Sequence, residues 1–169
     1  MRNVHEREFP VPAERVGALL ARVAEPDSPV WPPDWPPMRL DRPLGVGAQG
    51  GHGTVRYRCT EWVPGRRVEL TFPPGFLLEG TAVVEVVDGP WPDSCVLRHD
   101  MGGRLRGAGL LIWPLALRWL HDAMVEDMLD RTAVSLGLPP VAPARWSPWV
   151  SFIRRIMGRR RAAAAQPAR

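Results

Sequence analysis

Few side chains in this sequence are suited to acid–base chemistry: four histidines, one tyrosine and two cysteines. Tyr57, His99 and His121 each recur among apolar residues at the period of a strand or a helix, on the face expected to be buried. Imidazole titrates near neutral pH, so two histidines and a phenol on one apolar face are candidates for general acid and base. The structural alternative is that each group is satisfied in the core or lies at a cavity rim.

The sequence offers little for a metal or cofactor. The histidines are dispersed, with no HExxH or paired Cys/His spacing, and adjacent helical residues such as His121 and Asp122 point about 100° apart. We expect the glycine-rich stretch 45–53 to be a loop that connects to a strand, because it lacks the GK[ST] of a phosphate-binding loop and precedes a strand-like segment. We therefore expect no metal, no cofactor and no catalytic triad, which would need a nucleophile elbow.

The element that must position His121 is a long amphipathic helix predicted over residues 113–136. Its apolar stripe recurs at spacings of three and four, and its acidic residues lie around the other side. Gly137, followed by two prolines, predicts its end. The stripe contains Leu117, Leu120, Met124 and Met128, and the acidic side contains Asp122, Glu126, Asp127 and Asp130.

Tyr57 and His99 belong to segments with a period of two. A strand is predicted over residues 2–9, a helix follows Pro12, and four alternating segments joined by Gly/Pro turns then predict an antiparallel meander with one buried face. Two tryptophans in the proline-rich segment 30–38 either cap an opening or pack that loop onto the body. The inward set is Val55, Tyr57, Val68, Leu70, Phe72, Val84, Leu97 and His99.

This order resembles the START-like (SRPBCC) superfamily, and within it the bacterial polyketide cyclase/dehydrase-type proteins. The resemblance covers about residues 3–136 and rests on FPVPAERVGALLARV, RYRCTEWVPGRRVELTF and LHDAMVEDMLD. It implies an α+β helix-grip fold, in which a curved antiparallel sheet grips a long C-terminal helix, with a domain over residues 1–138. It also implies a cavity that binds an apolar small molecule such as a lipid or polyketide, with or without cyclase or dehydratase activity. No catalytic motif is shared across the superfamily.

Placed in that fold, the inward residues form the expected ligand site. Catalysis, where present, would rest on His99, His121 or Tyr57. The expected ligand-binding residues are Tyr57, Cys59, Leu70, Phe72, Val84, Leu97, His99, Leu117, His121 and Met124.

Charge separates the tail from the domain. Residues 1–138 hold 15 arginines and 18 acidic residues, whereas residues 139–169 hold seven arginines and no acid. We expect a linker and then a basic amphipathic helix over residues 146–161, outside the domain core. It either contacts an anionic membrane, docks on its own domain or a partner, or has no stable role. Membrane contact would use Trp149, Phe152, Ile153, Arg154 and Arg155.

The remaining expectations concern partners and compartment. No element that reads nucleic acid is visible, so no nucleic-acid partner is expected. Cys59 and Cys95 stand far apart without CxxC spacing, typical of reduced thiols in a cytoplasmic protein. We expect a cytoplasmic protein, with peripheral membrane contact if the tail provides it. The sequence leaves the oligomeric state open.

Overall fold

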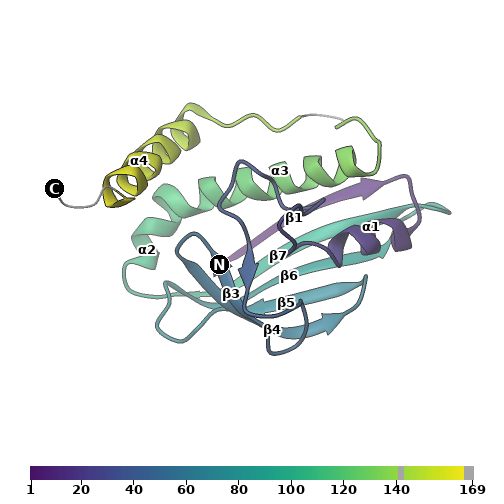
Figure 1. Cartoon of the computed structure of the whole chain (residues 1–169), viewed down its shortest axis with the longest axis horizontal. Coiled ribbons are helices and arrows are strands. Elements are labelled where there is room, and N and C mark those ends of the chain that lie inside the picture. Colours follow the sequence, from purple (N-terminus) through teal and green to yellow (C-terminus); the bar gives the residue numbers. More distant parts are fainter. Residues whose placement is uncertain (141–142, 166–169) are drawn as a thin grey trace.

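The computed structural model describes residues 1–140 and 143–165, with side chains described as far as Met157. Seven antiparallel strands form one sheet in the order β1-β7-β6-β5-β4-β3-β2, and a long helix lies across one face (Figure 1). The predicted α+β architecture is confirmed. The strands are β1 Arg2–Phe9, β2 Arg39–Leu40, β3 Gln49–His52, β4 Val55–Val63, β5 Arg67–Thr71, β6 Leu78–Asp88 and β7 Cys95–Leu105.

The covering helix is continuous from α2 (Gly109–Ile112) through a π-helical turn, η1 (Trp113–Leu117), into α3 (Arg118–Ser135). It begins four residues before the predicted start, so Pro114 lies inside it. The wider π turn accommodates a residue that has no N–H and whose ring crowds the preceding turn. The helix ends as predicted: Gly137 has φ +77°, and Leu138 N–H donates to the carbonyl of Ala133, which satisfies the last turn.

Strand β1 and helix α3 are joined by a ladder of polar contacts. Asn3, His5 and Arg7, at alternate positions of β1, face Asp122, Glu126 and Asp130, at every fourth position of α3. Two strand residues rise about 6.7 Å and four helical residues 6 Å, so the two series stay in step. The acidic side of the helix is therefore not a solvated back, because three of its four carboxylates bind the edge strand.

Helix α1 (Ala13–Leu20) closes the end of the fold opposite α2 (Figure 1). Val16 and Leu20 are fully buried, as the spacing of three and four predicts. The helix approaches the β4–β5 turn so closely that a β-carbon on Gly17 would lie 2.2 Å from the carbonyl oxygen of Gly65. Only glycine fits at this contact.

The glycine-rich stretch forms a strand, β3, where the sequence predicted a loop. Gly50 and Gly51 lie against neighbouring backbone: an added β-carbon would meet the carbonyl oxygens of Arg39 and Val55, each at 1.9 Å. The glycines thus permit the strands to approach closely. Because they have no side chains, they also leave no alternation of polar and apolar residues by which the strand could be recognised. The consequence for the cavity is that β3 carries His52 to its wall.

The tail helix α4 (Pro148–Ala165) docks on its own domain, which was one of the three alternatives, and the expectation that it lies wholly outside the domain core was wrong. Val150 is 3% exposed and belongs to the core. Trp149 Nε1–H donates to the carbonyl oxygen of Leu115 at 2.9 Å, and Figure 1 shows the chain returning along α3 to place α4 near α2. Among the described residues, no helix has the length and apolar character needed to cross a bilayer.

Candidate functional site

A cavity of about 460 Å³ lies between the inner face of the sheet and the covering helix. Strands β4 to β7 supply one wall, η1 and α3 the opposite wall, and the loop containing Trp31 and Trp35 closes one side. Most lining side chains are apolar. A concave apolar site with few polar groups is the usual form of a small-molecule pocket.

The predicted inward residues lie where alternation placed them. Of the ten expected ligand-binding residues, eight line the cavity: Tyr57, Leu70, Phe72, Val84, His99, Leu117, His121 and Met124. Cys59 and Leu97 do not. Both are fully buried on the same face of the sheet, but they pack in the core beyond the cavity wall. A period of two determines which face of the sheet a residue lies on. Whether that residue also lines the cavity depends on whether the helix is separated from the sheet at that point of the strand.

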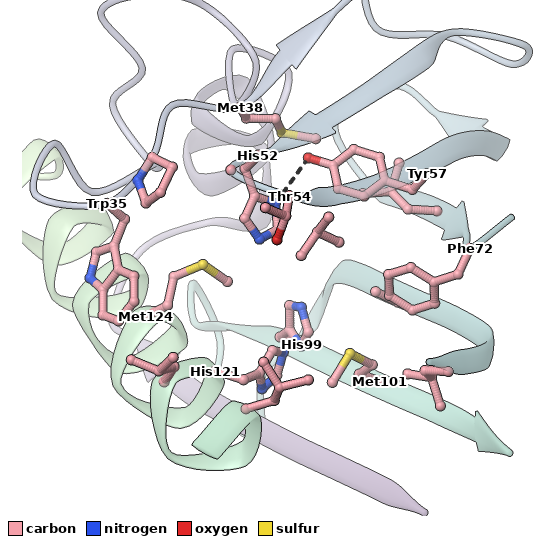
Figure 2. A pocket seen from close by; sticks show the side chains of 18 of the residues that line it. Trp35, Met38, His52, Thr54, Tyr57, Phe72, His99, Met101, His121 and Met124 are labelled. Atoms are coloured by element: carbon pink, nitrogen blue, oxygen red, sulfur yellow. Dashed lines mark hydrogen bonds between the residues drawn. The ribbon is translucent and has the colours of Figure 1, made fainter. Parts of the chain in front are cut away.

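One polar pair lies on the β3–β4 side of the cavity. His52 Nδ1 and the hydroxyl of Tyr57 are 3.3 Å apart (Figure 2). The imidazole also packs against the indole of Trp31, with ring centroids 5.0 Å apart. Burial lowers the pKa of His52 to about 4, and nearby His121 and Arg56 lower it in the same direction. Burial also raises the pKa of Tyr57. The pair is therefore neutral at physiological pH.

His52 is a site residue that the sequence analysis missed. It follows two glycines that were assigned to a connection, so nothing placed its side chain on a face. The available signal was the short turn of Gly53 and Thr54 between His52 and Val55, which is typical of a two-residue hairpin. Reading that hairpin would have paired His52 with Val55 and put β3 beside β4.

A second polar pair lies across the cavity in Figure 2, where β7 meets α3. The rings of His99 and His121 meet edge to face with centroids 4.9 Å apart. Burial lowers the pKa of both, and for His99 the charges of His121 and His5 add to the effect. Within the described residues, His99 Nδ1 and both ring nitrogens of His121 have no hydrogen-bond partner. These nitrogens are neutral groups able to serve a ligand.

A carboxylate beside this pair, that of Asp122, stays ionised. Burial alone would raise the pKa of Asp122, but the neighbouring His121, Asn3 and His5 outweigh it and hold the pKa well below its usual range. Asp122 Oδ1 lies 4.0 Å from His121 Nδ1, beyond hydrogen-bonding distance, so it acts on that ring through its charge.

Helix α4 completes the cavity at one side, where Arg154 and Met157 line it. The guanidinium carbon of Arg154 lies 4.2 Å from the ring centroid of Trp35 and 3.9 Å from that of Trp146. Both indole N–H groups donate to one oxygen of Asp127, at 2.6 and 2.8 Å. We call Arg154, Trp35, Trp146 and Asp127 the α4 clamp. It binds the tail helix to the proline-rich loop and to α3.

The chain resembles several solved structures at low sequence identity. Norcoclaurine synthase from Thalictrum flavum, in complex with dopamine and hydroxybenzaldehyde, matches with a TM-score of 0.59 and 14% identity over 81% of this chain and 87% of that one. A Thermobifida fusca protein solved by NMR matches with a TM-score of 0.59 and 17% identity, over 82% and 97%. The chain has the helix-grip fold.

CalU16 from Micromonospora echinospora matches with a TM-score of 0.58 and 14% identity, covering 96% of this chain and 86% of that chain. A match of that extent takes in the segment after α3. No protein-family profile matches the sequence, and no curated protein matches it by sequence similarity. The similarity therefore concerns the fold, and the chemistry of the site must be argued from its own residues.

Proposed function

We propose that the protein binds an apolar small molecule, lipid-like or polyketide-like, in the cavity between sheet and helix. The observation that carries this proposal is the cavity itself, about 460 Å³ with apolar walls and neutral polar pairs on opposite sides. Buried neutral imidazoles and a phenol can each donate or accept a hydrogen bond without bringing charge into an apolar space. We therefore expect a ligand that is mostly apolar and has a hydrogen-bonding group at each end, one for each polar pair.

Catalysis at this site would fall to His99 and His121. A neutral imidazole can take a proton from a ligand and return it elsewhere, as cyclisation and dehydration both require, and Tyr57 is protonated and able to donate. Norcoclaurine synthase, which has this fold, has been seen with two aromatic compounds bound. That precedent supports a site for ring-containing ligands here.

A pair of variants on β6 tests the binding proposal. Ala82 lines the cavity, while Val83, the next residue, is buried without lining it. Ala82→Leu should weaken binding of the apolar fluorescent probe phenylnaphthylamine at least tenfold, because the added atoms occupy the cavity, and Val83→Leu should leave it unchanged. Equal affinities in both variants, with both folded by circular dichroism, would show that the probe binds elsewhere. Native mass spectrometry of the protein from its own host then identifies the retained ligand.

A second candidate function is contact with an anionic membrane, for which an exposed apolar patch provides the observation. Leu111, Leu115 and Trp119 project from one side of the helix at spacings of four, and α4 adds Trp149 and Phe152, whose rings stack on each other. All five are between 45% and 69% exposed. The surface differs from the sequence expectation, because Ile153 and Arg154 face the domain. Arg155 is exposed on the same helix.

A further inference from the structure

Three potential metal ligands meet where β1 runs along α3, and one of them, His121, also lines the cavity. His5 Nε2 lies 3.1 Å from Asp122 Oδ1, and His121 Nδ1 lies 4.0 Å from the same oxygen. One ligand atom from each of the three residues lies within 4.8 Å of the other two. The sequence analysis excluded His121 and Asp122 as a pair of metal ligands, because the side chains of adjacent helical residues point in different directions. The structure brings both toward the edge strand, where His5 supplies the third group.

The polar atoms around Asp122 are not satisfied by the described part of the protein. His121 Nδ1 and Nε2 and the side-chain oxygen of Asn3 are buried there without a hydrogen-bond partner. A buried polar group without a partner destabilises the fold, because it has given up its hydrogen bonds to water. Of these atoms, His121 Nδ1 is an electron-pair donor that lies 4.0 Å from Asp122 Oδ1, so a cation bound beside Asp122 would satisfy it.

We propose that His5, His121 and Asp122 form a binding site for a divalent transition-metal ion of the Zn²⁺ type. Two imidazoles and a carboxylate are a donor set that such ions prefer. Bonds of 2.0–2.1 Å in a tetrahedral site hold neighbouring ligand atoms about 3.3 Å apart. The His5–Asp122 pair, at 3.1 Å, already has this spacing, and His121 Nδ1, at 4.0 Å, must approach Asp122 Oδ1 by about 0.7 Å to reach it.

The groups behind these ligands fit a metal site as well. His5 Nδ1 lies 2.7 Å from Glu126 Oε1, and a proton on Nδ1 leaves the lone pair of Nε2 directed toward Asp122. Glu126 is held in turn by Arg7 at 2.9 Å. Asn3 Nδ2 donates to Asp122 Oδ1 at 2.8 Å. Carboxylates that orient a ligating histidine in this way are usual around bound Zn²⁺ and raise its basicity.

The site acts on the cavity through His121, which lines it. A metal on Nδ1 confines the ring proton to Nε2, so that nitrogen becomes a hydrogen-bond donor and the ring loses the freedom to exchange tautomers. With metal bound, His121 is a positioned donor, and of the two imidazoles proposed for catalysis His99 is the one left to act as general base. The competing arrangement is one in which both ring nitrogens of His5 are used in hydrogen bonds to Asp122 and Glu126, so that neither is available to a metal.

The test uses the full chain, freed of metal by chelation. Zn²⁺ should bind with a stoichiometry of one by isothermal titration, and Co²⁺ should give the visible absorption of a low-symmetry site with nitrogen ligands. His5→Asn, His121→Asn and Asp122→Asn should each weaken Zn²⁺ binding at least about 100-fold, and Glu126→Gln about tenfold. His52→Asn is the matched control, since it changes a buried histidine of the same cavity outside the cluster.

A measurement on the unmodified protein guards against variants that fail to fold. Addition of Co²⁺ should shift the ring signals of His5 and His121 in the NMR spectrum far more than those of His52. The proposal is overturned if the full chain binds neither ion stoichiometrically, if His52→Asn weakens binding as much as the ligand variants, or if Co²⁺ affects the histidines alike. Any of these outcomes leaves His5, Asp122 and Glu126 as hydrogen-bonded members of the ladder only.

Discussion

Replacing Arg154 with glutamine should release α4 from the domain. The guanidinium lies over two indole rings at 4.2 and 3.9 Å and donates to the backbone carbonyl of Asp34. At a half-buried position each cation–π contact is worth about 0.5–1 kcal/mol, and a hydrogen bond from a charged group at least about 1 kcal/mol. The docked state should therefore lose about 2 kcal/mol. Since 1.4 kcal/mol corresponds to a factor of ten, the undocked fraction should rise roughly 30-fold.

Hydrogen exchange measures this change directly. A helix of 18 residues is marginal in water once it leaves its packing surface, so the amides of α4 should exchange roughly 30-fold faster in the variant. Probe entry should also be faster, because Arg154 lines the cavity. The sheet should keep its protection.

Arg155→Gln provides the control, because it removes the same charge from an exposed neighbour on the same helix. It should leave exchange in α4 within about threefold of the unmodified protein. If neither variant accelerates exchange in α4 by more than about threefold, the α4 clamp does not hold the helix and docking rests on buried Val150 instead. If both variants accelerate exchange equally, the net charge of the tail is responsible.

Two further predictions concern acid and lipid. The pKa of folded His52 is about 4 and its ordinary value is 6.5, so the unfolded chain binds the extra proton as pH falls between them. The contribution of His52 to the free energy of unfolding should be constant above pH 6.5 and should fall by about 3 kcal/mol as the pH is lowered to 4. Urea midpoints measured across that range should therefore decline less steeply in His52→Asn than in the unmodified protein. Vesicles containing anionic lipid should retain the full chain at low salt, and Leu111→Asp with Leu115→Asp should reduce the bound fraction at least tenfold. Val46→Asp, at an apolar residue equally exposed elsewhere, should not change it, and no sedimentation of the unmodified protein would exclude the membrane function.

The sequence predicted those parts of the fold in which one periodicity governs a whole element. The apolar stripe of α3 and the alternation through β4 to β7 placed Tyr57, His99 and His121 on the cavity side. Where glycine removes the alternation, the prediction failed: β3 was assigned to a connection and His52 was overlooked.

The tail shows a different limit. The spacing of Trp149, Ile153 and Arg154 is the same whether the helix lies on a lipid surface or on its own domain. The position of the helix is determined by the surface that it packs on, which includes Trp35 and Asp127 from two remote segments. A local sequence pattern carries no information about that surface. The same reason explains why the proximity of His5 to His121 and Asp122, more than a hundred residues apart, could not be anticipated.

The ladder between β1 and α3 also has a consequence for the order of folding. Among the strands of this sheet β1 is synthesised first, yet its sheet partner β7 follows about ninety residues later and its helical partners in α3 later still. Contacts this distant in sequence slow folding, because the intervening chain must be closed before they form. During synthesis β1 therefore waits as a single extended segment. Its charged residues, among them Glu6, Arg7 and Glu8, keep that segment soluble and make it a poor template for pairing with another nascent chain.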